Sequence, residues 1–172
     1  MSAAPQGRLK LPREIEATPE QNDAISKVLA ESEGPLWEGG RLRVARLPLS
    51  PTIEDALLQA LNFRKLERGL EQAEKILGAE QKGLLAVQAK QGAAPAQRVS
   101  RLLVIARDGA ERFNRACESL LARHSDRVLG MVVDVDSERL GLALFGPGKA
   151  VKALLVTDRD AVTRILRSLI KK

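Results

Sequence analysis

The sequence has few of the residues that disulfides, nucleophilic catalysis and base stacking require. Its 172 residues include one Cys, one His, one Trp, three Phe and no Tyr. Because a single cysteine cannot form an intrachain disulfide, we expect a reducing compartment, the cytoplasm. So few aromatic side chains cannot form the exposed stacking surface with which four-stranded-sheet proteins read single-stranded RNA.

Long apolar runs are also missing. No uninterrupted apolar stretch approaches the roughly 18 residues of a transmembrane helix. The first 20 residues carry charges and prolines where a signal peptide needs an apolar segment. We therefore expect a soluble protein with no membrane partner. The hydrophobic content of 44% is enough for one sizeable core, or one core and a small appended unit.

Positive charge is concentrated in the second half of the chain. The net charge is +6, with 13 Lys and Arg against 13 Asp and Glu in residues 1–97, and 15 against 9 in residues 98–172. A cationic excess favours an anionic partner such as nucleic acid, although it also serves solubility alone. With the shortage of aromatics, it favours structured RNA that is bound through its backbone and shape.

The region from Arg101 to Asp158 alternates short apolar runs with amphipathic segments. The runs are rich in Val, Leu and Ile and end at aspartates, which is typical of buried strands, and the segments between them have helical spacing. The order β-α-β-α-β-α predicts an α/β fold, a three-layer α-β-α sandwich around a small mixed sheet. The predicted strands are 102–106, 128–133 and 150–156, and the predicted helices are 109–123, 136–145 and 158–169.

The part before this region is predicted to be mostly helical. Thr18 and Pro19 resemble a helix N-cap followed by a first-turn proline, with Gln21 completing a capping box. A short strand is expected at 41–47, and a long helical pattern starts at Ser50 and is broken near Asn62 and Gly69. We predict three parts, namely a flexible tail (1–17), a mostly helical N-terminal region (18–77) and an α/β domain (78–172).

The α/β region resembles a known family. The resemblance rests on Leu102 to Ala110, on Ser137 to Gly146 with its Leu-Gly-x-Ala helix, and on Lys149 to Asp158 with its small and branched residues. In this order they are similar to the bacterial branch of the kink-turn-binding ribosomal protein family, the L-seven-Ae and L-thirty-e type. The resemblance implies a three-layer fold and binding of structured RNA, on the ribosome or within another ribonucleoprotein.

The resemblance extends upstream. In the family, a helix that begins with Gly, then a polar or acidic residue and later Val or Thr and Lys, precedes the first strand. Gly83, Val87 and Lys90 can be laid on this pattern, which would make Gly83 the start of a helix. Further upstream, residues 56–70 are similar to the C-terminal helices of the YlxR-type RNA-associated domain. Gly40-Arg41 resemble two residues of the Gly-Arg-Gly run of that domain.

Several basic residues and one glycine are candidates for RNA contact. A glycine at a helix start lets a phosphate approach the backbone N–H groups, and arginine offers a planar donor fork. We predict that these residues gather at one edge of the sheet, that affinity falls steeply with salt, and that residues 79–172 alone keep most RNA binding. The candidates are Lys82, Gly83, Lys90, Arg98, Arg101, Arg107, Lys149 and Lys152.

Catalytic interpretations are weaker. Asp134 and Asp136 follow a strand and could hold Mg²⁺, but a helix N-cap at Asp136 or Ser137 explains them better. Residues 146–150 lack the Gly and the Ser or Thr of a phosphate-binding loop. Cys117 and His124 lie close in one predicted helical stretch without an orienting acid, and a partly charged His124 would suit the helix dipole. We expect no enzyme activity, no cofactor and no metal.

A second function is left open. The apolar residues of the 53–77 pattern could dock a partner protein or a second copy of the chain, instead of packing in the core of the chain itself. In that case the purified protein would be a dimer indifferent to RNA. The residues of this stripe are Ile53, Leu57, Phe63, Leu66 and Leu70.

Overall fold

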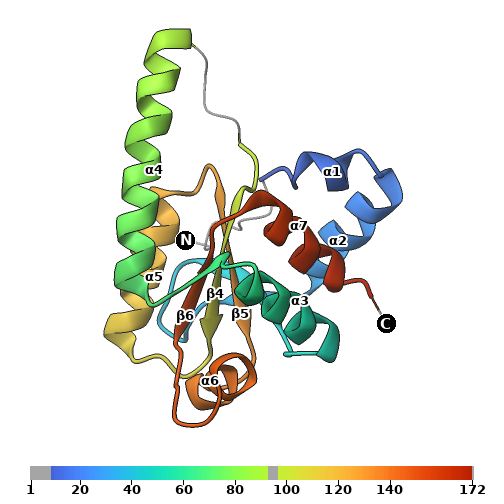
Figure 1. Cartoon of the computed structure of the whole chain (residues 1–172), viewed down its shortest axis with the longest axis vertical. Helices are drawn as coiled ribbons and strands as arrows, with labels where there is room; N and C mark the ends of the chain where they lie inside the picture. Colours follow the sequence, from blue (N-terminus) through green and yellow to red (C-terminus); the bar gives the residue numbers. More distant parts are fainter. Residues whose placement is uncertain (1–8, 93–96, 172) are drawn as a thin grey trace.

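The computed structural model describes residues 9–92 and 97–171, which form seven helices and six strands. Helices cover both faces of one mixed sheet, so the predicted α/β class with three layers is confirmed (Figure 1). The elements are α1 (Arg13–Glu16), α2 (Pro19–Glu31), β1 (Glu33–Pro35), β2 (Arg43–Leu47), α3 (Pro51–Asn62), β3 (Leu66–Arg68), α4 (Leu70–Gln91), β4 (Arg101–Ala106), α5 (Glu111–Arg123), β5 (Val128–Val133), α6 (Ser137–Phe145), β6 (Ala153–Val156) and α7 (Arg159–Ser168).

The strands lie in the order β1-β2-β5-β4-β6-β3. The central strands β2, β5 and β4 are parallel, whereas β6 and both edge strands pair in the antiparallel sense. The carboxyl ends of β4 and β5 therefore meet at one end of the sheet, beside the start of β6. We call this the carboxyl end, and the opposite end the amino end.

Alternate residues of the strands pack into two cores. Leu102, Val104 and Ala106 of β4 face a core that α2, α3, α6 and α7 cover. Leu103 and Ile105 face the second core, which α4 and α5 cover. This alternation is the period of a strand that is buried on both sides. The two helical layers lie on either side of the sheet in Figure 1.

The sheet is not confined to residues 78–172. Strands β1, β2 and β3 come from residues 33–68 and supply both edges of the sheet. β2 pairs with β5 because Val44 fits one core while Ala45 and Leu47 fit the other. The region that we expected to be mostly helical is thus part of the same sheet, and the expected boundary at position 78 lies inside α4.

The expected flexible tail is wrong for residues 9–17. Leu11 and Ile15 are buried in the larger core, and Lys10 forms a parallel bridge with Arg98. Ile15 is the buried residue of the short helix α1, and Leu11 lies in the segment before it, which Lys10 ties to the chain before β4 through hydrogen bonds with Gln97 and Val99 at 2.9 and 2.8 Å. Residues 1–8 lie outside the described part of the chain.

The helix caps were only partly predicted. Asp136 and Asp158 accept hydrogen bonds from the backbone N–H groups of Arg139 and Ala161, at 2.7 and 3.1 Å. Thr18, in contrast, makes no side-chain cap bond, so the predicted capping box is wrong. Pro19 at the first helical position fixes the start of α2 without it.

The stripe proposed as a docking face belongs to the core of the chain. Ile53, Leu57 and Leu66 are at most 8% exposed, and Leu70 packs against the second core. Only Phe63 projects, and it is 62% exposed. The alternative interface of residues 53–70 is therefore already occupied by the sheet and by α7.

Candidate nucleic-acid interface

The eight predicted contact residues do not meet at one edge of the sheet. They lie in three places, so the predicted single cationic margin is wrong. The cause is the direction of β4, which carries residues close in sequence to opposite ends of the sheet. Arg98 and Arg101 lie at the amino end, Arg107, Lys149 and Lys152 at the carboxyl end, and Lys82, Gly83 and Lys90 on the distal half of α4.

The two arginines at the amino end are engaged by the protein itself. Arg98 donates to the Leu11 carbonyl at 2.7 Å and forms an ion pair with Glu16 at 3.2 Å. Arg101 donates both from Nε and from Nη2 to the Glu80 carboxylate, at 3.0 to 3.2 Å. Their first role is to tie α1 and α4 to the start of β4.

Arg127, which was not among the predicted contact residues, completes this arrangement. Its side chain is 7% exposed, donates to Glu80 at 2.8 Å and also donates to the Leu77 carbonyl at 3.0 Å. Burial raises the pKa of Glu80, but the hydrogen bonds from Arg101 and Arg127 outweigh it, and the pKa lies below its ordinary value. Glu80 is therefore a charged anchor of α4.

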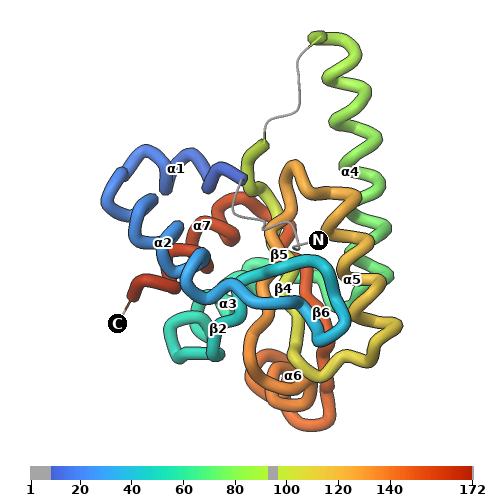
Figure 2. The backbone as a smooth tube through the Cα atoms, turned by 180° about the vertical axis from the view of Figure 1, so that it is seen from behind, coloured from blue at the N-terminus to red at the C-terminus, as the bar shows by residue number. Residues whose placement is uncertain are grey.

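The distal half of α4 extends beyond the sheet at the amino end, as Figure 2 shows from behind. Gly83 lies in the interior of this helix, with no atom near the position of a Cβ, so the predicted helix start at Gly83 is wrong. The error arose because the apolar spacing at 70–77 and at 84–87 belongs to one continuous helix. Leu84, Leu85 and Val87 are exposed there, between 39% and 57%.

The carboxyl end of the sheet brings together the other three candidates. Lys149 and Lys152 lie in the loop between α6 and β6, and the Lys152 carbonyl accepts a hydrogen bond from Ala106 N–H at 2.9 Å. Lys152 also lies over the Phe113 ring, at 5.9 Å. Arg107, the residue after Ala106, pairs with Asp134 at 3.8 Å. All three side chains are exposed.

Arg68 and Gly69 adjoin these residues, and sequence reasoning missed their role. Arg68 pairs with Leu154 across the β3–β6 ladder and stacks over Phe145, at 4.4 Å. Gly69 N–H donates to the Ala153 carbonyl at 2.9 Å, so the start of α4 lies directly beside the α6–β6 loop. We define the carboxyl-end surface as Arg68, Gly69, Arg107, Lys149 and Lys152.

The backbone of this surface is open to a ligand. Gly69 is the N-cap of α4, has a φ of 92° and makes no side-chain cap bond. The first N–H groups of a helix have no partner within it, and here they begin a helix of 22 residues. No atom lies within 4 Å of a Cβ placed on Gly69, Gly146 or Gly148. A phosphate can thus approach N–H groups that cationic side chains flank.

One signal could have located this helix start. Leu66-Glu67-Arg68 can be a short strand, and a glycine after a strand is a natural point for a turn into a helix. Gly69 instead resembles a break within a helical pattern, because Leu66 and Leu70 also have helical spacing. Three-residue edge strands carry too little periodicity to decide between the two.

Cys117 and His124 are both buried. Burial, with a smaller effect of the neighbouring Glu118 carboxylate, raises the pKa of the Cys117 thiol to about 12, so it is protonated at neutral pH. Burial together with Arg127 and Arg123 lowers the pKa of His124, and its Nδ1 has no hydrogen-bond partner within residues 9–92 and 97–171. These effects disfavour the partly charged His124 that we expected at the helix end.

The two aspartates after β5 have separate tasks. Asp134 is paired with Arg46 and Arg107, at 3.9 and 3.8 Å, whereas Asp136 caps α6. In the chain from 9 to 92 and from 97 to 171, no three His, Cys, Asp or Glu side chains are grouped in a way that could hold a metal ion. Within the same ranges, no helix is both long and apolar enough to span a bilayer.

The fold and this surface define an α/β protein with a cationic surface at the carboxyl end of its central strands. No protein-family model matches the sequence, and no curated protein matches it. Among solved structures, a protein of unknown function from Bacillus halodurans is similar over 70% of this chain and 98% of its own, with 19% identity and a TM-score of 0.44. The 15.5 kD RNA-binding protein of Giardia lamblia is similar over 70% of this chain and 83% of its own, with 16% identity and a TM-score of 0.43.

Proposed function

We propose that this protein binds structured RNA without catalysis, through the carboxyl-end surface. The observation that carries the proposal is the position of Arg68, Lys149 and Lys152 around the uncapped start of α4. None of these three side chains forms an ion pair within the described part of the chain, so they are available to phosphates. Neutral partners, the rings of Phe145 and Phe113, orient two of them.

The resemblance seen in the sequence supports the same surface once its register is corrected. The Gly, the acidic residue and the Lys of the family pattern can be placed on Gly69, Glu71 and Lys75, although residues 70–75 have no Val or Thr. Glu71 lies in the first turn of α4, where a carboxylate can accept hydrogen bonds from base amino groups. A kink-turn, with its bent backbone and exposed base edges, is the RNA that we expect this surface to bind.

The rest of this end is built to hold its shape. Asp108 accepts hydrogen bonds from both the N–H and the hydroxyl of Ser137, at 2.8 and 3.0 Å, and so ties the end of β4 to α6. Val151 N–H donates to the Ser137 carbonyl at 2.9 Å, which fixes the loop that carries Lys149 and Lys152. A surface that is set before binding loses less entropy when RNA arrives.

The test compares the wild type with the triple variant Arg68→Gln, Lys149→Gln, Lys152→Gln. The probe is a fluorescein-labelled hairpin RNA that contains a kink-turn, measured by anisotropy between about 50 and 200 mM salt. Each phosphate contact contributes about 0.7 to 0.9 to the slope of log K against log salt. We expect the triple variant to bind more weakly and its slope to fall by about 2.

The control variant Lys27→Gln, Arg41→Gln, Lys171→Gln removes the same charge from exposed positions elsewhere and should keep most of the affinity. If both variants lose the same affinity for the RNA, binding depends on net charge alone, and the proposed surface is contradicted. A wild-type protein that forms a dimer and ignores the RNA would instead favour the protein-interaction alternative.

A further inference from the structure

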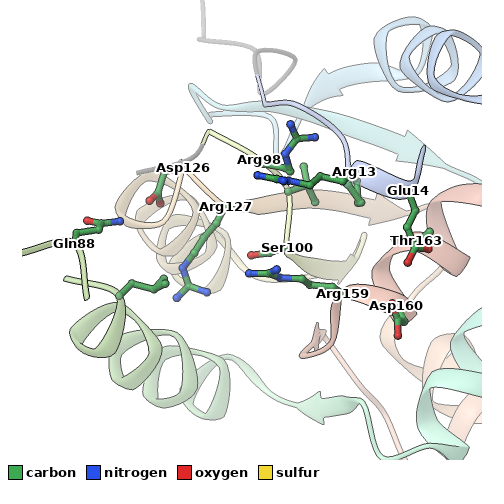
Figure 3. Close-up of a pocket in the computed structure, with 13 residues that line it drawn as sticks. Arg13, Glu14, Gln88, Arg98, Ser100, Asp126, Arg127, Arg159, Asp160 and Thr163 are labelled. Carbon is green, nitrogen blue, oxygen red and sulfur yellow. The ribbon is translucent and has the colours of Figure 1, made fainter. Parts of the chain in front are cut away.

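A cavity of about 330 Å³ lies at the amino end of the sheet, on the side opposite to the carboxyl-end surface. It is formed where α1, the segment before β4, the loop before β5, the distal part of α4 and the start of α7 meet (Figure 3). This volume is at the lower end of the range that small-molecule sites occupy, about 300–1,000 Å³. Nothing in the RNA-binding proposal uses this cavity.

Arginine side chains occupy its centre. Four arginines line it, namely Arg13, Arg98, Arg127 and Arg159, and all four are labelled in Figure 3. Arg98 is held by Leu11 and Glu16, but Arg13 and Arg159 make no hydrogen bond or ion pair within residues 9–92 and 97–171. Arg127 is also engaged, by Glu80 and the Leu77 carbonyl, so Arg13 and Arg159 are the two arginines of the lining whose charge is open to an anion.

Apart from the four arginines, the lining is acidic, polar or apolar. Asp126 lies on the α4 side of the arginines, and Glu14 and Asp160 lie on the α7 side (Figure 3). Carboxylates accept hydrogen bonds from hydroxyl and amino groups but exclude a ligand that is anionic throughout. Val99 and Leu84 add apolar surface. The lining thus fits a ligand with one anionic group, several donors and an apolar part.

We propose that this cavity binds a nucleoside monophosphate, either as a free nucleotide or as the 5′-terminal nucleotide of an RNA. The phosphate contacts Arg13, Arg98 and Arg159, which present planar donor forks suited to phosphate oxygens. The ribose hydroxyls and any amino group of the base donate to the flanking carboxylates. The Ser100 hydroxyl, which also lines the cavity, is a further donor to the phosphate.

The first measurement is calorimetric titration of the full chain, in a buffer without phosphate, with 5′-AMP, adenosine and inorganic pyrophosphate. We expect saturable binding of 5′-AMP, and binding of adenosine and of pyrophosphate that is at least about tenfold weaker, because each lacks one half of the recognised ligand. Absence of binding by 5′-AMP would overturn the proposal. Equal affinity for 5′-AMP and adenosine, or for 5′-AMP and pyrophosphate, would overturn it too.

The variant Arg13→Gln, Arg159→Gln tests the assignment to this cavity. Both side chains are exposed and make no hydrogen bond or ion pair with the residues that the structure describes, so the variant should fold, which circular dichroism checks. We expect its affinity for 5′-AMP to drop at least about tenfold, since two charge-assisted hydrogen bonds are lost. The matched variant Arg41→Gln, Arg112→Gln removes the same charge and should change the affinity by less than about twofold. Equal behaviour of the two variants would place the ligand elsewhere.

A competition experiment separates the two sources of the ligand. If the natural ligand is an RNA end, a short RNA with a 5′-phosphate should displace 5′-AMP, and the same RNA with a 5′-hydroxyl should not. If neither displaces it, the free nucleotide is the ligand. The Arg68→Gln, Lys149→Gln, Lys152→Gln variant should bind 5′-AMP normally, so failure of the RNA-binding proposal and failure of this one give different results.

Discussion

At the scale of single residues, His124 makes folding sensitive to pH. It is 3% exposed, and its Nδ1 has no hydrogen-bond partner among the described residues. Burial and the nearby Arg127 and Arg123 hold its pKa below the ordinary value of about 6.5 that it regains on unfolding. As pH falls through that value, His124 binds a proton in the unfolded chain but stays neutral in the folded chain. The free energy of unfolding should therefore decrease from pH 7.5 to 5.5.

Urea unfolding of the wild type and of His124→Gln at pH 7.5, 6.5 and 5.5 measures this effect. Because Gln does not titrate, the variant should lose less stability than the wild type over the same interval. Glu16 and Glu80, whose pKa values are lowered from 4.5, contribute mainly below this window. Parallel pH profiles for the two proteins would show that His124 is not responsible.

Gly141 is a second residue with a large expected effect. A Cβ at this position would lie 1.7 Å from the backbone oxygen of Lys149, because α6 packs directly on the loop of the carboxyl-end surface. Gly141→Ala should lower the free energy of unfolding by about 1–3 kcal/mol or more, and should weaken RNA binding by moving Lys149.

Gly83→Ala is the matched control for this change. No atom lies near the position of the added Cβ, and alanine favours a helix interior over glycine by up to about 1 kcal/mol. This variant should unfold at the same or a higher urea concentration and bind RNA normally. Loss of RNA binding in Gly83→Ala would restore the original assignment of that glycine and contradict the corrected register.

At the scale of elements, α4 is held by one carboxylate. The Glu80 carboxylate forms ion pairs with Arg101 and with the buried Arg127. Glu80→Gln would therefore leave the Arg127 guanidinium buried without its counter-charge. We expect the free energy of unfolding to fall by about 2 kcal/mol or more. Backbone amides of residues 78–91 should also exchange hydrogen faster, while those of 70–77, beside the buried Ala73 and Leu77, should change less.

Glu74→Gln is the control on the same helix. Glu74 pairs with Arg123 at 3.3 Å, and both side chains are more than 40% exposed. The loss of such a surface pair changes stability by about 0.5 kcal/mol. If the two variants are equally stable, the Arg101–Glu80–Arg127 cluster does not anchor α4.

The contrast between elements explains how far the sequence could predict this structure. Strands β4 and β5 and helices α5 and α7 were predicted within about two residues, because their periodicity and their terminal aspartates agree. β3 was missed, since three residues hold no periodicity and its register depends on β6, which lies far away in sequence. The candidate site failed for a similar reason, because no local pattern tells to which end of the sheet Arg98 and Arg107 belong.

At the scale of the whole molecule, the two proposed sites lie at opposite ends of one sheet. β4 links them, with Arg98 shortly before its start and Arg107 directly after its end. The net charge of the second half, which suggested one phosphate-binding margin, is divided between these ends. Each end therefore has its own set of variants, and RNA binding and nucleotide binding can be measured separately.

The same view changes the expectation for the fragment 79–172. It contains β4, β5 and β6 but lacks β1, β2 and β3, so both edges of its remaining sheet would lose their partners. It also lacks α2, α3 and the first turns of α4, which cover apolar residues on both faces. We now expect this fragment not to fold cooperatively and not to bind the RNA hairpin, contrary to the expectation from the charge distribution.

A chain of residues 9–172 is the control, because it keeps every described element. Circular dichroism during heating should show a cooperative transition for the control and none for the fragment, whereas a folded fragment that binds the hairpin would show that residues 33–78 are dispensable for the sheet.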